Sequence, residues 1–185
     1  MAETAWVNPP ARAGLVAAAA LVALALAFAP SSRIAYAAAG AATCEGTSII
    51  TYTPGLTEVP RPIHYDETDL FSACESTDAS LTNGVALASA DVIGTCTGLP
   101  IVLRDPGYTI TWNNGLSSTI DLIFTDAIVD GTEQVTGTGT VTAGEFQNGN
   151  ATIVWDYPVL TPAQCFTAQG VTSQTGNLTA QITLS

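Results

Sequence analysis

The sequence predicts an all-β domain, an antiparallel β-sandwich of the immunoglobulin-like type stabilised by two disulfides. Beyond Cys44 the chain is rich in threonine, valine, isoleucine and glycine and contains no lysine, a composition that favours strands and turns over helices. No segment shows a 3.6-residue hydrophobic period over the length of a helix. Eight short stretches of strand character are separated by turn signals, which is the pattern of a sandwich or a barrel.

Two hairpin signals stand out among the turns. Asn114-Gly115 and Asp130-Gly131 each suit a type I′ turn, in which both central residues have positive φ. The segment 158–172 contains two prolines and is predicted to be a loop that crosses one end of the domain, tethered by Cys165. The predicted strands are residues 46–53, 61–71, 82–95, 108–113, 117–129, 132–142, 150–157 and 176–184.

Residues 1–37 are predicted to be a signal peptide that is cleaved near Ala37. Arg12 precedes an uncharged apolar run from Gly14 to Ala29, and Ala35-Tyr36-Ala37 places small residues at the cleavage positions. A retained membrane anchor is the alternative, although a spanning helix needs about 20 apolar residues. A lipid anchor on Cys44 is a weaker one. Cleavage leaves residues 38–185 as one secreted domain with no membrane attachment.

The secreted domain is strongly acidic. After cleavage only Arg61 and Arg104 remain against fifteen acidic residues, a formal net charge of −13. Binding to a phosphate backbone depends on clustered lysine and arginine, so the composition excludes nucleic acid as a partner. The negative charge favours solubility outside the cell.

Four cysteines in an exported chain predict two disulfides. Three pairings of Cys44, Cys74, Cys96 and Cys165 are possible. The predicted strands place Cys44 at the start of one strand and Cys74 just beyond the end of its antiparallel partner. This arrangement favours Cys44–Cys74 and Cys96–Cys165. The chain has no C-x-x-C motif and one histidine, so a zinc site is disfavoured.

Four threonine- and glycine-rich segments, 44–48, 52–56, 108–112 and 137–144, carry a resemblance to known sequences. The chain resembles a group of small exported actinobacterial proteins that have an alanine-rich signal followed by a Thr/Gly-rich β domain with spaced cysteines. The resemblance extends over most of residues 44–185. The group has no assigned activity, so the resemblance implies a fold and a location but no site residue.

The candidate catalytic residues do not form a recognisable constellation. His64 is the only histidine, and no G-x-S-x-G nucleophile elbow is present. On a strand His64 and Asp66 share a face, which predicts a hydrogen bond or an ion pair between them. No pair of carboxylates can be nominated for glycoside hydrolysis. We therefore expect no enzymatic activity and no cofactor.

Two groups of carboxylates are candidate calcium ligands. Neither follows the D-x-[DN]-x-[DN]-G loop pattern, and solvated acidic loops are the favoured interpretation, so no metal is predicted. The groups are Asp66, Glu67 and Asp69 with Glu75 and Asp78, and Asp126 with Asp130 and Glu133.

Two aromatic residues are candidates for a ligand platform. Trp155 and Tyr157 alternate on one predicted strand and share a face, where exposed rings would stack on sugars. The alternative is that Trp155 fills the core beside Ile153. On another strand Thr136, Thr138, Thr140 and Thr142 form a row that is expected to face solvent. Gly137 and Gly139 on the opposite face indicate close approach of another backbone or a bulge.

These observations predict a non-enzymatic structural or binding module at the cell envelope or in the medium. Its expected partner is a cell-wall glycan or a secreted or surface protein. The alternative is an inhibitor or accessory protein of secreted hydrolases, which would present Pro100–Pro106 or Pro158–Cys165 as a rigid loop.

Overall fold

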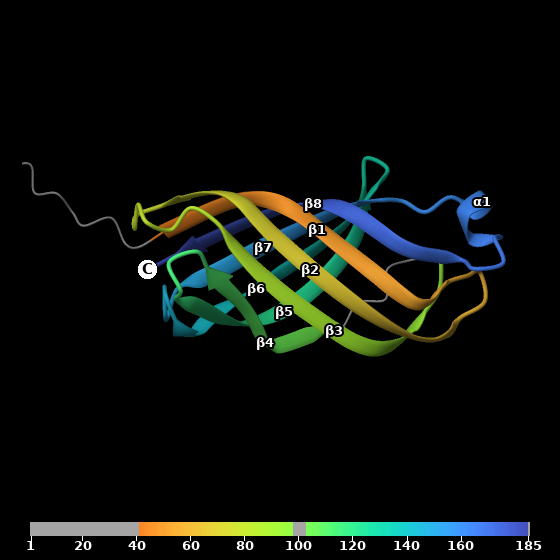
Figure 1. The fold of residues 1–185 in the computed structure, drawn as a ribbon, viewed down its shortest axis with the longest axis horizontal. Helices are drawn as coiled ribbons and strands as arrows, with labels where there is room; N and C mark the ends of the chain where they lie inside the picture. Colours follow the sequence, from red (N-terminus) through yellow and green to blue (C-terminus); the bar gives the residue numbers. More distant parts are fainter. Residues whose placement is uncertain (1–40, 98–102, 185) are drawn as a thin grey trace, which may run out of the picture. The chain divides into compact units, whose positions relative to one another are not determined.

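Eight strands pair in sequence order and close into an antiparallel β-barrel (Figure 1). The computed structural model describes residues 41–97 and 103–184, so the predicted signal peptide lies outside the described residues. Each strand pairs with the next, and the last strand also pairs with the first, which closes the barrel. The elements are β1 (Ala41–Leu56), β2 (Arg61–Ser76), β3 (Gly84–Gly94), β4 (Arg104–Trp112), β5 (Ser117–Val129), β6 (Thr132–Gly144), β7 (Asn150–Pro158), α1 (Pro162–Cys165) and β8 (Val171–Thr183).

The predicted immunoglobulin-like sandwich is wrong, although the all-β class is confirmed. A sandwich keeps two separate sheets, each with edge strands, whereas here β1 pairs with β8 as extensively as with β2. Both architectures place alternate residues of each strand in a shared interior. The alternation in the sequence therefore predicts the strands equally well in either case and does not reveal the closure.

The hairpin predictions are confirmed in position and differ in turn geometry. Asp130 and Gly131 have φ values of 50° and 79°, as a type I′ turn requires. At the other hairpin Gly115 has a φ of 84°, whereas Asn114 is not among the described residues with positive φ. The Trp112 N–H donates to the Leu116 carbonyl at 2.8 Å. This hairpin therefore closes through a longer loop than the two-residue turn that Asn-Gly predicts.

Inward-facing aromatic rings fill one end of the barrel. Trp112 is 2% exposed and lies with its ring centroid 6.1 Å from Phe71 and 6.2 Å from Phe146. Gly84 faces the Trp112 ring, and a Cβ atom there would lie 2.6 Å from it. We call this region, formed by the buried residues Phe71, Trp112 and Phe146 with Gly84, the apolar end.

The glycines opposite the threonine row allow close approach, as predicted. A Cβ atom at Gly139 would lie 1.9 Å from the Asp121 carbonyl oxygen on β5. At Gly137 the neighbours are instead the rings of Trp155 and Phe124. The threonines face outward, and Thr138 and Thr140 are exposed.

Both predicted disulfides are confirmed. Cys44 and Cys74 are bonded, and they are also register partners on β1 and β2. Cys96 is bonded to Cys165, which ties α1 and the connection between β7 and β8 to the segment after β3. Across residues 41–97 and 103–184 no helix has the length and apolar character needed to cross a membrane.

Candidate functional site

The inward face of β2 carries two carboxylates among apolar side chains. Side chains alternate along a strand, so residues of odd number from 63 to 71 point into the barrel. Asp69 is 1% exposed, and Glu67 beside it is half-buried. The register of β1 places Ser48 directly opposite Asp69. These three side chains begin a polar cluster that we call the interior cluster: Ser48, Glu67, Asp69, Tyr108, Trp155 and Tyr157.

Asp69 is held by two aromatic donors from β4 and β7, neither of which pairs with β2. The Tyr108 hydroxyl donates to Asp69 Oδ2 at 2.6 Å, and Trp155 Nε1 lies 3.1 Å from both carboxylate oxygens. Burial raises the pKa of Asp69, although these hydrogen bonds oppose the rise. Burial and the Asp69 charge hold the pKa of Tyr108 well above its usual value, so Tyr108 remains a donor.

Glu67 belongs to a triangle of oxygen atoms with Ser48 and Tyr157. Glu67 Oε1 lies 3.0 Å from Ser48 Oγ and 2.9 Å from the Tyr157 hydroxyl, and the two hydroxyl oxygens lie 2.7 Å apart. Burial raises the pKa of Glu67 to about 8, and the charge of Asp69 adds to the rise. The interior cluster therefore retains a proton at pH values where an ordinary glutamate is ionised.

Further polar groups lie close to the interior cluster. The Tyr52 hydroxyl donates to Gln174 Oε1 at 2.8 Å, and Gln174 Nε2 donates to the Pro158 carbonyl at 3.3 Å. Glu133 is 4% exposed and is the register partner of Tyr157. Within the described residues every buried side-chain nitrogen and oxygen has a hydrogen-bond partner. The interior cluster can hold protons, because its polar atoms form hydrogen bonds with one another.

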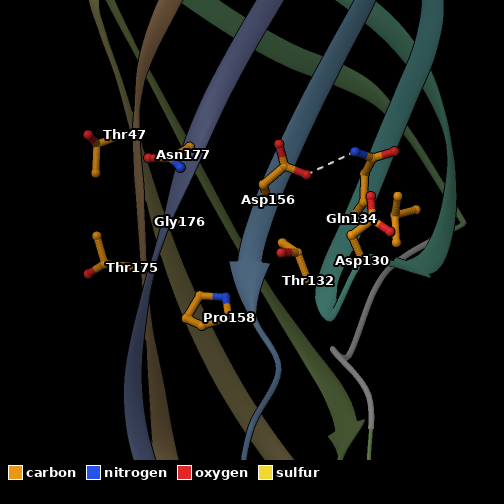
Figure 2. A pocket seen from close by; sticks show the side chains of 10 residues that line it. Thr47, Asp130, Thr132, Gln134, Asp156, Pro158, Thr175, Gly176 and Asn177 are labelled. Atoms are coloured by element: carbon orange, nitrogen blue, oxygen red, sulfur yellow. Dashed lines mark hydrogen bonds between the residues drawn. The ribbon is translucent and has the colours of Figure 1, made fainter.

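The outer surface carries a groove across four neighbouring strands, which Figure 2 shows from close by. Register pairing aligns Thr47 on β1 with Asn177 on β8, then Asp156 on β7 and Gln134 on β6. Gln134 Nε2 donates to Asp156 Oδ1 at 2.9 Å. The turn after β5 adds Asp130 to the lining, and the groove has a volume of about 570 Å³. We call it the outer groove.

The described lining of the outer groove is mainly polar, and Val129 and Pro158 are its apolar side chains. Threonine hydroxyls and the amides of Asn177 and Gln134 each offer a donor and an acceptor, while Asp130 and Asp156 offer acceptors. Among the described residues, no lysine, arginine or histidine lines the groove. Such a surface can form hydrogen bonds with a neutral, hydroxyl-rich ligand and offers nothing to neutralise an anion.

Trp155 and Tyr157 share a face, and that face points into the barrel. They are 2% and 1% exposed, so neither ring is presented on the outer surface. Trp155 lies on the same inward face as Ile153 and packs against Tyr108, with ring centroids 5.9 Å apart. The structure thus places both candidate platform residues in the interior cluster, with the outer groove on the opposite face of β7.

His64 lies on the outer face of β2 and contacts two aspartates. Its Nε2 is 3.4 Å from Asp66, the predicted partner, and its Nδ1 is 2.9 Å from Asp91 on β3. The hydrogen bond with Asp91 raises the pKa of His64. Asp66 points outward whereas Glu67 points inward, because neighbouring strand residues face opposite sides. The first predicted carboxylate group is therefore divided between two faces.

The second carboxylate group is divided in a similar way. Asp126 and Asp130 are exposed near the tip of the β5–β6 hairpin, whereas Glu133 is buried. In the described part of the chain no three His, Cys, Asp or Glu side chains converge as metal ligands would. Of the two candidate inhibitor loops, Pro158–Cys165 is described, while Pro100–Pro106 includes residues 100–102, which lie outside the described residues.

Sequence reasoning missed the interior cluster although a signal for it was present. Glu67 and Asp69 occupy the same alternating positions of β2 as Ile63, Tyr65 and Phe71. If these apolar residues face inward, the two carboxylates must face inward as well. The outer groove left no comparable signal, because its lining combines the consecutive strands β6, β7 and β8 with Thr47 on β1, and only pairing of β1 with β8 brings them together. No protein-family model matches the chain, and no curated protein and no solved structure is significantly similar to it.

Proposed function

We propose that this protein is a secreted, non-enzymatic binding module that recognises a neutral glycan in the outer groove. The observation that carries the proposal is the groove itself, about 570 Å³ in volume and lined by hydroxyl, amide and carboxylate groups together with the apolar side chains of Val129 and Pro158. Its volume lies within the range of about 300–1,000 Å³ that is typical of small-ligand sites. Sugars are recognised through hydrogen bonds to their hydroxyl groups, and this lining supplies both donors and acceptors.

The electrostatics of the groove favour a neutral glycan over an acidic one. Two carboxylates, Asp130 and Asp156, line it, and the whole chain has a formal net charge of −12. An acidic sugar would meet like charge there with no arginine or lysine to compensate. The two disulfides are consistent with an oxidising compartment outside the cytosol, where glycans of a cell envelope are accessible.

The positions of the groove residues are also fixed by the fold, as recognition of a ligand requires. Three of them, Asn177, Asp156 and Gln134, lie on consecutive strands of a closed barrel, where backbone pairing fixes their spacing. The hydrogen bond from Gln134 holds the Asp156 carboxylate in place (Figure 2). A preformed site loses less conformational entropy when its ligand binds.

The test is binding of neutral oligosaccharides by isothermal titration calorimetry with the variant N177A. Loss of the central amide should weaken binding about tenfold, corresponding to roughly 1.4 kcal/mol. The matched control is S89A on β3, which is exposed, faces outward and does not line the groove. Absence of binding to any neutral glycan, or equal affinity of N177A and the native protein, would overturn the proposal.

A second candidate function is inhibition of a secreted hydrolase through the connection between β7 and β8. Phe166 is 76% exposed directly after Cys165, whose disulfide with Cys96 anchors that connection. An exposed aromatic on an anchored loop is a suitable residue for the pocket of a protease. Nanomolar inhibition of a protease in a panel, abolished in F166A, would support this function, and no inhibition across the panel would remove it.

A further inference from the structure

We propose that the floor of the outer groove is coupled to a proton held inside the barrel, and that ligand affinity in the groove therefore depends on pH. The link is Tyr157, whose ring lies under Gly176 in the groove and whose hydroxyl belongs to the oxygen triangle with Ser48 and Glu67. The affinity part of this inference rests on the proposed function. The coupling itself concerns the protein without ligand.

The proton content of the triangle follows from counting hydrogens. Its three edges, 2.7, 2.9 and 3.0 Å long, are all of hydrogen-bond length. The hydroxyls of Ser48 and Tyr157 supply two hydrogens, enough for at most two edges, and Ser48 also interacts with Asp69. A third edge needs a hydrogen on the carboxyl group of Glu67. Protonated Glu67 thus completes the ring, and ionised Glu67 leaves two oxygens facing each other without a hydrogen between them.

The surroundings of Glu67 favour the protonated form. The Asp69 carboxyl lies in the same low-dielectric interior, and the negative charges of Asp69 and Glu67 would repel each other if both groups were ionised. Burial raises the pKa of Glu67 to about 8, and the charge of Asp69 adds to this. The non-titrating neighbours include Ala88 on β3 and Gln174 on β8. The titratable groups that face this region are Tyr52 from β1, Tyr65 and Asp69 from β2, Asp105 and Tyr108 from β4, Glu133 from β6 and Tyr157 from β7.

Contact between the triangle and the groove is direct at Gly176. A Cβ atom at this position would lie 2.6 Å from Tyr157 Cδ1, so the ring leaves no room for a side chain there. Ser48 is the register partner of Gly176 on β1. Two of the three members of the triangle therefore lie against the backbone that forms the groove floor. A shift of the Tyr157 hydroxyl when Glu67 ionises moves the ring on which Gly176 rests.

The coupling predicts tighter ligand binding when Glu67 is protonated, because the complete hydrogen-bonded ring fixes the floor in the described geometry. Coupling between sites in proteins typically corresponds to a factor of about five or more. We expect neutral-glycan affinity to fall by about fivefold between pH 6 and pH 9. By reciprocity, saturating ligand should shift the ionisation of Glu67 to higher pH.

The test uses the Gly176 backbone amide as a reporter in ¹H–¹⁵N NMR spectra recorded between about pH 5 and pH 10. In the native protein this signal should titrate with the ionisation of Glu67, near pH 8. In E67Q, where the amide mimics the protonated carboxyl, the Gly176 signal should stay near its low-pH position. In Y157F the ring remains under Gly176 but its hydroxyl is removed, so the titration should also disappear there.

The control variant is H64Q, because His64 titrates on the outer face of β2 and its pKa is also raised. Its Gly176 signal should titrate as in the native protein. Coupling is overturned if the native Gly176 signal does not titrate, or if its titration persists in both E67Q and Y157F. A titrating Gly176 signal in a protein that binds no neutral glycan would support the coupling and overturn the proposed function. Glycan binding of equal affinity at pH 6 and pH 9 would overturn the link to affinity.

Discussion

The apolar end and the interior cluster share the same strands of one barrel, yet different forces stabilise them. At the apolar end Trp112 packs between Phe71 and Phe146, and burial of apolar surface provides the stability. In the interior cluster Asp69 is removed from water and Glu67 is partly removed, which costs free energy, and hydrogen bonds from side chains of β1, β4 and β7 offset that cost. One region is insensitive to protons and the other depends on them.

The difference shows how one alternating pattern produces two environments. On β2 the inward positions run from Phe71 at the apolar end to Asp69 and Glu67 one and two positions further along the same face. Polar groups in a dry interior need partners, and here aromatic residues with polar atoms supply them. Tyr108, Trp155 and Tyr157 each donate to the cluster while burying a large ring. Aromatic residues thus join the two environments without leaving a buried polar atom unpaired.

The largest expected effect is at the apolar end. W112A removes a ring that is 2% exposed and leaves a cavity between Phe71 and Phe146, which should lower the free energy of unfolding by about 3–5 kcal/mol. Denaturant titration followed by circular dichroism measures it. The loss should be the same at pH 5 and pH 8, since the described contacts of the ring are with Phe71, Phe146, Gly84 and the Ser118 hydroxyl, which do not titrate in this range. L87A, where the side chain is 72% exposed, is the control and should stay within about 0.5 kcal/mol of the native protein.

The second effect is a dependence of stability on pH that arises in the interior cluster. The folded protein raises the pKa of Glu67 from 4.5 to about 8, so it binds a proton that the unfolded chain has released. This contribution is fully present below about pH 4.5 and is lost as pH rises through 8. The free energy of unfolding should therefore fall by about 2–4 kcal/mol between pH 5 and pH 9.

E67Q separates this effect from other titrations in the same range. The variant cannot ionise at position 67, so its stability curve should be flatter than that of the native protein between pH 5 and pH 9. His64 also has a raised pKa, and its contribution is lost in the same direction, so H64Q serves as the matched control. If the pH dependence disappears in H64Q and persists in E67Q, its source is the outer surface and the comparison between the two regions fails.

The smallest of the three effects concerns one hydrogen bond of the interior cluster. Y108F removes the donor at 2.6 Å from Asp69 while keeping the ring in place against Trp155. Loss of a hydrogen bond to a charged group should lower the free energy of unfolding by about 1.5–3 kcal/mol. Thermal and denaturant unfolding at pH 8 measure the loss. A loss that exceeds that of W112A would mean that polar contacts, and not ring burial, dominate the stability of the barrel.

Local features of the sequence predicted much of the fold. Alternation and turn residues located all eight strands, and the Asp130-Gly131 turn formed as expected because only a few residue types accept positive φ at both positions. Strand ends were less accurate: β8 begins at Val171, five residues before the predicted start. The disulfide pairing was predictable because Cys44 and Cys74 lie on consecutive strands joined by a short connection. The outward threonine row on β6 followed from the same period of two.

The sequence alone predicted the strands, the positions of the turns, the favoured cysteine pairing and the excess of negative charge. Closure of the sheet is visible only in the folded protein, because pairing of β1 with β8 joins the two ends of the described chain and leaves no local trace. The tertiary structure also determines which polar residues lie together. Pairing of β6, β7 and β8 places Gln134, Asp156 and Asn177 in one groove, and closure of the barrel brings Tyr157 on β7 to Glu67 on β2. Side-chain period is a property of each strand, whereas closure and site assembly are properties of their pairing.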